Sequence, residues 1–202
     1  MRKGIFSKLA VQNIRNNKST YIPYMITCIF CIAMIYMMEF LRDCPTLDQA
    51  VRHAAEVRMI LSTGEVVVVI FCVIFLIYSN SFLMKRRQKE IGLYNILGLE
   101  RNHIGIVLLL ETIFTTILSL TGGIAIGILA SKLSLLLLLR LLHIPAVLGF
   151  YISTKGIITC LLMFGAIFLL ILLLNLRRIH LSRPVAVSYT HLRAHETGRN
   201  LV

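Results

Sequence analysis

Hydrophobic positions along the chain gather into four long stretches that contain no charged residue, and charged residues collect in the segments between them. The stretches cover residues 19–38, 66–84, 112–131 and 156–176. A helix needs roughly 20 apolar residues to cross a hydrocarbon core about 30 Å thick. The pattern therefore predicts an all-α membrane protein with four transmembrane helices.

Composition supports a membrane protein and argues against a water-soluble domain. Hydrophobic residues make up 57% of the 202 residues and charged residues only 15%, whereas soluble domains carry about 25% charged residues. The net charge of +12 is spread over the ends of the spans. This spread indicates attraction to membrane lipid rather than a nucleic-acid-binding face.

The distribution of basic residues predicts the orientation, because Lys and Arg collect in cytoplasmic segments near the membrane. With the N-terminus inside, six basic residues fall on the outer side: Arg42, Arg52, Arg58, Lys132, Arg140 and Lys155. Thirteen fall on the inner side: Arg2, Lys3, Lys8, Arg15, Lys18, Lys85, Arg86, Arg87, Lys89, Arg101, Arg177, Arg178 and Arg183. We therefore expect a multi-pass plasma-membrane protein with both termini in the cytoplasm.

The segments outside the spans receive simpler interpretations. Residues 1–18 are expected to form a cytoplasmic interfacial helix, because their apolar side chains can share one side. Residues 19–187 would form the four-helix transmembrane domain. Residues 41–62 would be an outer loop, with a short helix around 47–59.

The third span carries a row of small residues at a spacing of four. Its members are Thr115, Ser119, Gly123, Gly127 and Ser131. Small side chains let helix backbones approach closely inside a membrane. Gly is also common in transmembrane helices for other reasons, but the regularity over five positions favours close packing against a partner helix.

Glu111 begins the same row and is an intramembrane carboxylate near the inner interface. Such a group faces protein or water, so we expect it to snorkel or to pair with Arg86 or Arg87. A proton relay is less favoured, because no second titratable group is evident at depth. A channel or secondary carrier is disfavoured because the spans show no polar stripe or pair of buried charges. No metal constellation or cofactor motif is visible.

The segment between the second and third spans predicts a short amphipathic helix on the inner membrane surface. Glu90 can pair with Arg86 at a spacing of four, and Gly98 is a natural C-terminal cap. Ile91 and Tyr94 share an apolar face, with Leu93 beside it. An exposed apolar face of this kind requires a partner.

The same segment carries a resemblance to a known family. Lys-Arg-Arg-Gln-Lys-Glu-Ile-Gly-Leu-Tyr-Asn-Ile-Leu-Gly-Leu, at residues 85–99, resembles the coupling segment of FtsX-like ABC transporter permeases. Ile-Tyr-Ser-Asn-Ser-Phe at 77–82 and Leu-Ala-Val-Gln-Asn-Ile-Arg-Asn-Asn-Lys at 9–18 resemble the bacitracin-resistance type of Gram-positive bacteria. The similarity runs from about residue 9 to residue 187.

The resemblance implies a function and partners. In this family a dimeric cytoplasmic ATPase hydrolyses ATP. The permease, which is not an enzyme, transmits the resulting conformational change across the membrane. Members protect against peptide antibiotics that target the cell wall, often beside a sensor histidine kinase. The resemblance places the ATPase-coupling surface at eight residues: Arg86, Arg87, Glu90, Ile91, Gly92, Leu93, Tyr94 and Gly98.

The chain also departs from the family pattern. Full-length members have ten spans and a large outer domain, so we expect this chain to be an N-terminal fragment. Residues 188–202 resemble translated adapter read-through and are expected to be a foreign, disordered tail. Other functions stay open: an FtsX-like regulator of cell-wall hydrolases, a lipoprotein-release permease, or a membrane scaffold without an ATPase.

Overall fold

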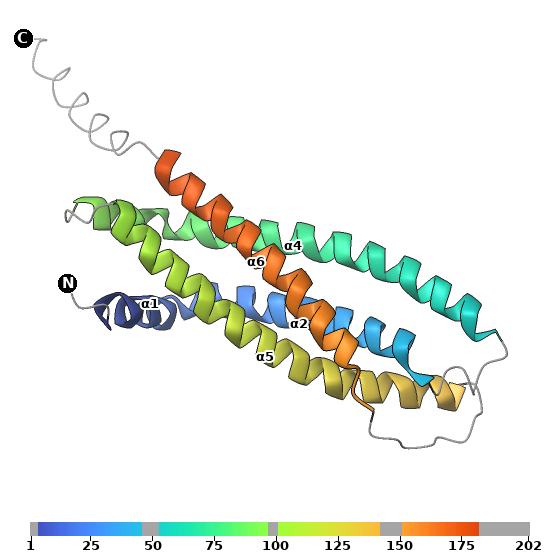
Figure 1. Cartoon of the computed structure of the whole chain (residues 1–202). Coiled ribbons are helices and arrows are strands. Elements are labelled where there is room, and N and C mark those ends of the chain that lie inside the picture. Colours follow the sequence, from blue (N-terminus) through green and yellow to red (C-terminus); the bar gives the residue numbers. More distant parts are fainter. Residues whose placement is uncertain (1–3, 46–52, 97–100, 142–150, 182–202) are drawn as a thin grey trace, which may run out of the picture.

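The computed structural model describes residues 4–45, 53–96, 101–141 and 151–181. Within these ranges the chain forms five α-helices and no strand (Figure 1): α1 (Gly4–Asn16), α2 (Lys18–Asp43), α4 (Ala54–Ile96), α5 (Arg101–Leu141) and α6 (Thr154–Leu181). Four of them, α2, α4, α5 and α6, contain stretches long and apolar enough to cross a membrane. This confirms the predicted all-α fold with four helices of transmembrane length.

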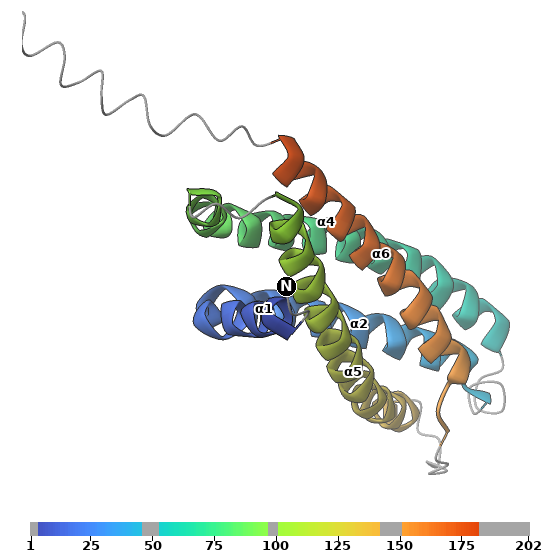
Figure 2. The ribbon, with the colours of Figure 1, turned by 60° about the vertical axis from the view of Figure 1, so that its left-hand side comes forward.

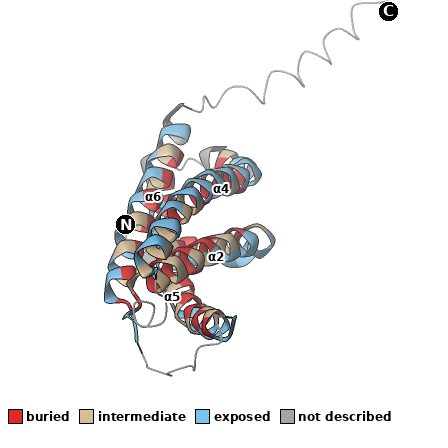
Figure 3. Ribbon diagram, turned by 90° about the vertical axis from the view of Figure 1, so that its right-hand side faces the viewer, coloured by how far each residue is buried: buried red, intermediate tan, exposed pale blue. Residues whose placement is uncertain are grey.

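Helix α2 lies at the centre of the bundle. It contacts all four of the other described helices, and Figures 1 and 2 show it running between α4 and α5 while α6 crosses over it. Its fully buried side chains form the middle of the apolar core: Cys28, Ile32, Ile35, Tyr36 and Phe40. Figure 3 shows the exposed residues on the outward sides of the helices. Many of them are apolar, as expected for surfaces in contact with lipid.

Helices α4 and α5 are longer than the spans predicted from the sequence. They contain 43 and 41 residues, which at 1.5 Å per residue is about 60 Å, roughly twice the hydrocarbon thickness. The prediction of a separate short coupling helix is wrong, because the segment is the C-terminal extension of α4. No proline lies within α4, and Gly92, the glycine in this segment, costs only about 1 kcal/mol in a helix interior, too little to break it.

The connection between α2 and α4 is shorter than the expected loop at 41–62. Helix α2 continues to Asp43 and α4 already begins at Ala54. The predicted helix at 47–59 is wrong as a separate element, because its residues from Ala54 onward are the first turns of α4, and residues 47–52 lie outside the described part. The apolar runs therefore did not predict where the helices begin and end.

Helix α1 packs against α5 and also touches α2. Ala10 and Asn13 are buried on its inner side, while Val11 and Gln12 are exposed. Asn17 separates it from α2 with a non-helical backbone (φ −103°, ψ 33°). Helix α1, the end of α4, the start of α5 and the end of α6 all lie at one end of the bundle (Figure 1), which we call the basic end after its Lys and Arg residues.

Candidate functional site

The row of small residues on α5 faces α2. A Cβ atom added to Gly123 would lie 2.6 Å from Cβ of Ile32, and one added to Gly127 would lie 3.0 Å from Cβ of Tyr36. The other three members of the row are buried: Thr115, Ser119 and Ser131. Only hydrogen fits at Gly123, so this contact depends on the absence of a side chain there.

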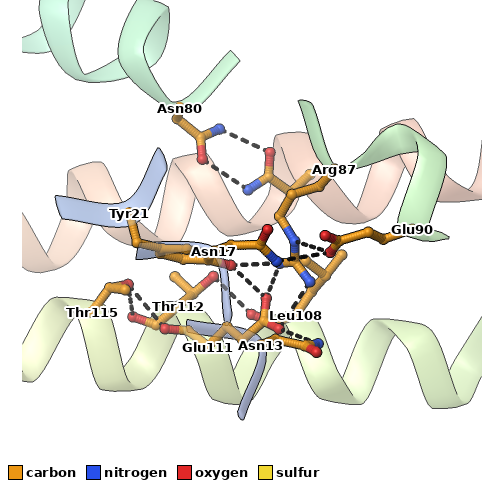
Figure 4. A network of polar contacts seen from close by, with 11 residues as sticks. Asn13, Asn17, Tyr21, Asn80, Arg87, Glu90, Leu108, Glu111, Thr112 and Thr115 are labelled. Atoms are coloured by element: carbon orange, nitrogen blue, oxygen red, sulfur yellow. Dashed lines mark hydrogen bonds and ion pairs between the residues drawn. The ribbon is translucent and has the colours of Figure 1, made fainter. Parts of the chain in front are cut away.

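A buried ion pair between α4 and α5 lies beside this contact, toward the basic end of the bundle. Arg87 and Glu111 are each only 2% exposed. The Arg87 Nη2 atom donates to Glu111 Oε1 at 3.0 Å, and Nη1 pairs with Oε2 of the same carboxylate. Figure 4 shows both side chains directed toward each other from their helices. The sequence left open whether Arg86 or Arg87 meets Glu111, and the structure selects Arg87.

Two further helices contribute side chains to Glu111. Asn13 on α1 donates its Nδ2 hydrogen to Glu111 Oε1 at 2.9 Å, and the Tyr21 hydroxyl on α2 donates to Oε2 at 3.0 Å. The same hydroxyl accepts a hydrogen bond of 2.6 Å from Arg87. We call Asn13, Tyr21, Arg87 and Glu111 the inner network (Figure 4). One carboxylate therefore joins α1, α2, α4 and α5.

Burial makes the inner network sensitive to the loss of any charge. A buried charge is costly unless it is paired and hydrogen-bonded, and removing one partner of such a pair is strongly destabilising. Here Glu111 accepts bonds at both oxygens, and the guanidinium carbon of Arg87 lies 5.6 Å from the centre of the Tyr21 ring. The sequence predicted no pair of buried charges in the spans, and a channel or carrier was disfavoured partly for that reason. The buried pair of Arg87 and Glu111 shows that this prediction is wrong.

A second polar contact joins α4 to α6. Asn80 and Asn175 exchange side-chain hydrogen bonds of 2.8 and 3.2 Å. A polar cavity of about 20 Å³ lies between this pair and the inner network, with Arg87 and Glu111 in its lining. A cavity of this size has room for about one water molecule. Through Asn175, α6 also has a polar link to this region.

Glu90 extends the inner network toward the C-terminal extension of α4. It accepts a hydrogen bond of 3.0 Å from Asn17 Nδ2, and one of its oxygens lies 3.7 Å from Arg87 Nε. The predicted partner was Arg86. In the structure the Arg86 guanidinium lies instead over the ring of Phe82, 4.8 Å from its centre.

The predicted ATPase-coupling residues divide into an exposed and a buried set. Leu93 is 54% exposed, Arg86 is also exposed, and a Cβ on Gly92 would meet only open space. Arg87 points into the bundle, and Ile91, 8% exposed, packs in a small apolar cluster: Met84, Ile91, Ile104 and Leu108. Gly98 and the side chain of Tyr94 lie outside the described part of the structure.

A second charged cluster lies at the opposite end of the bundle. Arg42 bridges two buried carboxylates, donating to Glu65 at 2.6 Å and pairing with Glu39, and Ser153 donates to Asp43 at 3.1 Å. This cluster was not predicted from the sequence. The available signal was that Glu39 directly follows the first apolar run and Glu65 directly precedes the second. Among the described residues no group of three or more His, Cys, Asp or Glu is arranged to hold a metal ion.

Comparison with known proteins identifies relatives of this chain. Residues 65–180 match a family described as FtsX-like permease C-terminal. The bacitracin export permease protein BceB of Bacillus subtilis (strain 168) is 28% identical over 169 residues, 84% of this chain and 26% of that protein. A protein of the same name from Halalkalibacterium halodurans is 29% identical over 167 residues, 83% of this chain and 26% of its own length.

An uncharacterised ABC transporter permease of Bacillus subtilis, YvcS, is 27% identical over 172 residues, 85% of this chain and 27% of that protein. The chain therefore spans about a quarter of the length of the relatives it matches. Arg87, Glu111 and Gly123 all lie inside the region that matches the family.

Proposed function

Because the chain belongs to the FtsX-like permease family, we propose that it is part of the membrane subunit of an ABC transporter. In this proposal a dimeric cytoplasmic ATPase hydrolyses ATP, and the chain transmits the resulting motion across the membrane. Two of the relatives are named as bacitracin export permeases. Their names support a role in resistance to, or sensing of, antimicrobial peptides. The proposal also includes a sensor histidine kinase as a second partner.

One observation supports the transmission role most strongly: a single helix carries both an exposed tip and a buried anchor. Leu93 lies six residues beyond Arg87 on α4, about 9 Å along the helix axis. The Leu93 side chain is exposed, whereas Arg87 is bonded to Glu111 and Tyr21. A force applied near Leu93 would therefore reach α5 and α2 through hydrogen-bonded charges.

The proposed ATPase-coupling surface lies on the C-terminal extension of α4. Leu93 and Arg86 would meet the ATPase directly, with Gly92 beside them, and the sequence resemblance assigns Tyr94 and Gly98 to the same surface. Arg87, Glu90 and Ile91 would act behind the surface, holding the α4 extension to α5, to α2 and to Asn17 between α1 and α2. The basic end would face the cytoplasm, as Lys and Arg distributions in membrane proteins favour.

The substitution Leu93→Asp tests the coupling surface. We expect the amount of ATPase that co-purifies with the tagged chain to fall by roughly tenfold or more, because an interface hot spot contributes about 2 kcal/mol or more. An ATP-binding-cassette subunit of a bacitracin-type transporter would be co-expressed as the candidate partner, and the chain's level in the membrane would be measured in parallel.

Leu141→Asp is the matched control, because Leu141 is an exposed leucine at the end of α5 that lies away from the basic end of the bundle. It should leave the recovered ATPase unchanged. Normal recovery with Leu93→Asp, at normal membrane levels, would contradict the proposed docking role.

A further inference from the structure

A groove with apolar walls lies between α1, α2 and α5 at the basic end. Its volume is about 530 Å³, within the range of small-molecule binding sites. Most of its wall is formed by apolar side chains, among them Ile14, Ile22, Met25, Phe114, Ile117 and Leu118. The groove is a feature of the membrane domain that the proposed transmission role does not use.

The charged residues of the groove are both cations. Arg15, at the end of α1, and Lys18, at the start of α2, line it and are exposed. Neither forms an ion pair with a carboxylate in the described part of the chain. The acidic groups of the neighbouring network, Glu90 and Glu111, are already bonded to other side chains.

The polar groups inside the groove are also engaged elsewhere. The Tyr21 hydroxyl donates to Glu111, and the Thr115 hydroxyl donates to the backbone carbonyl of Glu111 at 2.9 Å. A small water-soluble anion would therefore find no free donor at depth. Recognition of a charged ligand depends on the two cations at the rim, and the rest of the ligand must be apolar.

We propose that this groove binds an anionic phospholipid, with one acyl chain between α1, α2 and α5 and the phosphate held by Arg15 and Lys18. From Lys18 to Met25 the wall of α2 extends about 10 Å, enough for part of an acyl chain. Basic pockets between transmembrane helices are known to accept anionic headgroups. The ligand fits the site in both charge and polarity.

The site adjoins the inner network directly. Tyr21 and Thr115 line the groove on one side and the small polar cavity beside Arg87 on the other. A bound lipid would therefore hold α1 against α2 and α5 at the place where Asn13 and Tyr21 meet Glu111. This role is independent of whether an ATPase docks on α4.

The double substitution Arg15→Gln, Lys18→Gln tests the proposal. The purified protein would be titrated in uncharged micelles with fluorescent phosphatidylglycerol and, separately, with fluorescent phosphatidylcholine that has the same acyl chains. We expect phosphatidylglycerol affinity to fall by roughly 10- to 30-fold, since each basic residue near an anionic headgroup contributes about 1 kcal/mol. Phosphatidylcholine binding should not change.

Lys8→Gln, Lys85→Gln is the matched control, because it removes the same charge from exposed residues outside the groove. Its phosphatidylglycerol affinity should stay within about twofold of the parent. Equal losses in both double variants would overturn the proposal in favour of general surface attraction. Equal affinity of the parent for the two lipids would overturn it as well.

Met25→Trp tests the acyl-chain position separately, because the larger side chain would occupy part of the groove next to α2. We expect it to weaken binding of both lipids while the helical content, measured by circular dichroism, stays unchanged. Unchanged lipid binding by a folded Met25→Trp chain would place the acyl chain elsewhere. A lipid-free dimer that Met25→Trp dissociates would show that a second copy of the chain fills the groove, and would also overturn the proposal.

Discussion

Replacing Arg87 by methionine is expected to lower the free energy of unfolding of the bundle by about 3–5 kcal/mol. The substitution leaves the Glu111 carboxylate buried without its cation, although Asn13 and Tyr21 still donate to it. Reversible unfolding in mixed micelles, followed by circular dichroism, would measure the loss.

Two further variants distinguish the effect of breaking the buried ion pair from the effect of removing a positive charge. Arg87→Met combined with Glu111→Leu should recover most of the loss, because the second change removes the unpaired charge. Arg86→Met, at the exposed neighbouring position, should cost only about 1 kcal/mol or less, the contribution of an exposed cation–π contact. Equal losses for Arg86→Met and Arg87→Met would refute the buried pairing.

The second large effect is expected from Gly123→Ala. The added methyl carbon would overlap Cβ of Ile32, since a separation of 2.6 Å is below any ordinary carbon–carbon contact. Because Cβ of Ile32 cannot move without its backbone, α2 and α5 must separate. Overpacking of this kind costs about 1–3 kcal/mol, measurable by the same unfolding titration.

Gly165→Ala on α6 is the control for helix propensity, because an added Cβ there meets nothing within 4 Å. Alanine favours a helix over glycine by up to about 1 kcal/mol, so this variant should be as stable as the parent or slightly more stable. A Gly123→Ala chain that behaves like Gly165→Ala would show that α2 and α5 do not pack closely at Gly123.

The sequence predicted those features that depend on one helix at a time. Length and apolar content identified the four spans, and the spacing of four placed Gly123 and Gly127 on one side of α5. Because the two glycines lie four residues apart, their positions on a helix surface follow from its 3.6-residue period alone. The choice of α2 as the helix that covers them required the structure.

The features that the sequence did not predict depend on how two helices are rotated against each other. Arg86 and Arg87 are adjacent in the chain and point about 100° apart on a helix, so only the orientation of α4 decides which one reaches Glu111. Asn13 and Tyr21 carried no signal of their own, because each acquires its role only through a carboxylate on α5. The full length of α4 was not predicted, because charged residues end an apolar run in the sequence but do not end a helix.

The proposed function requires that the exposed tip of α4 lies in the cytoplasm, where an ATPase can reach it. All five native cysteines are buried and can be replaced by alanine before single cysteines are introduced at Leu93 and at Arg140, an exposed position at the opposite end of α5. Intact cells and inside-out vesicles would each be treated with a membrane-impermeant maleimide. We expect the cysteine at position 93 to react only in inside-out vesicles and the one at position 140 to react only in intact cells. Labelling of position 93 from outside intact cells would contradict it.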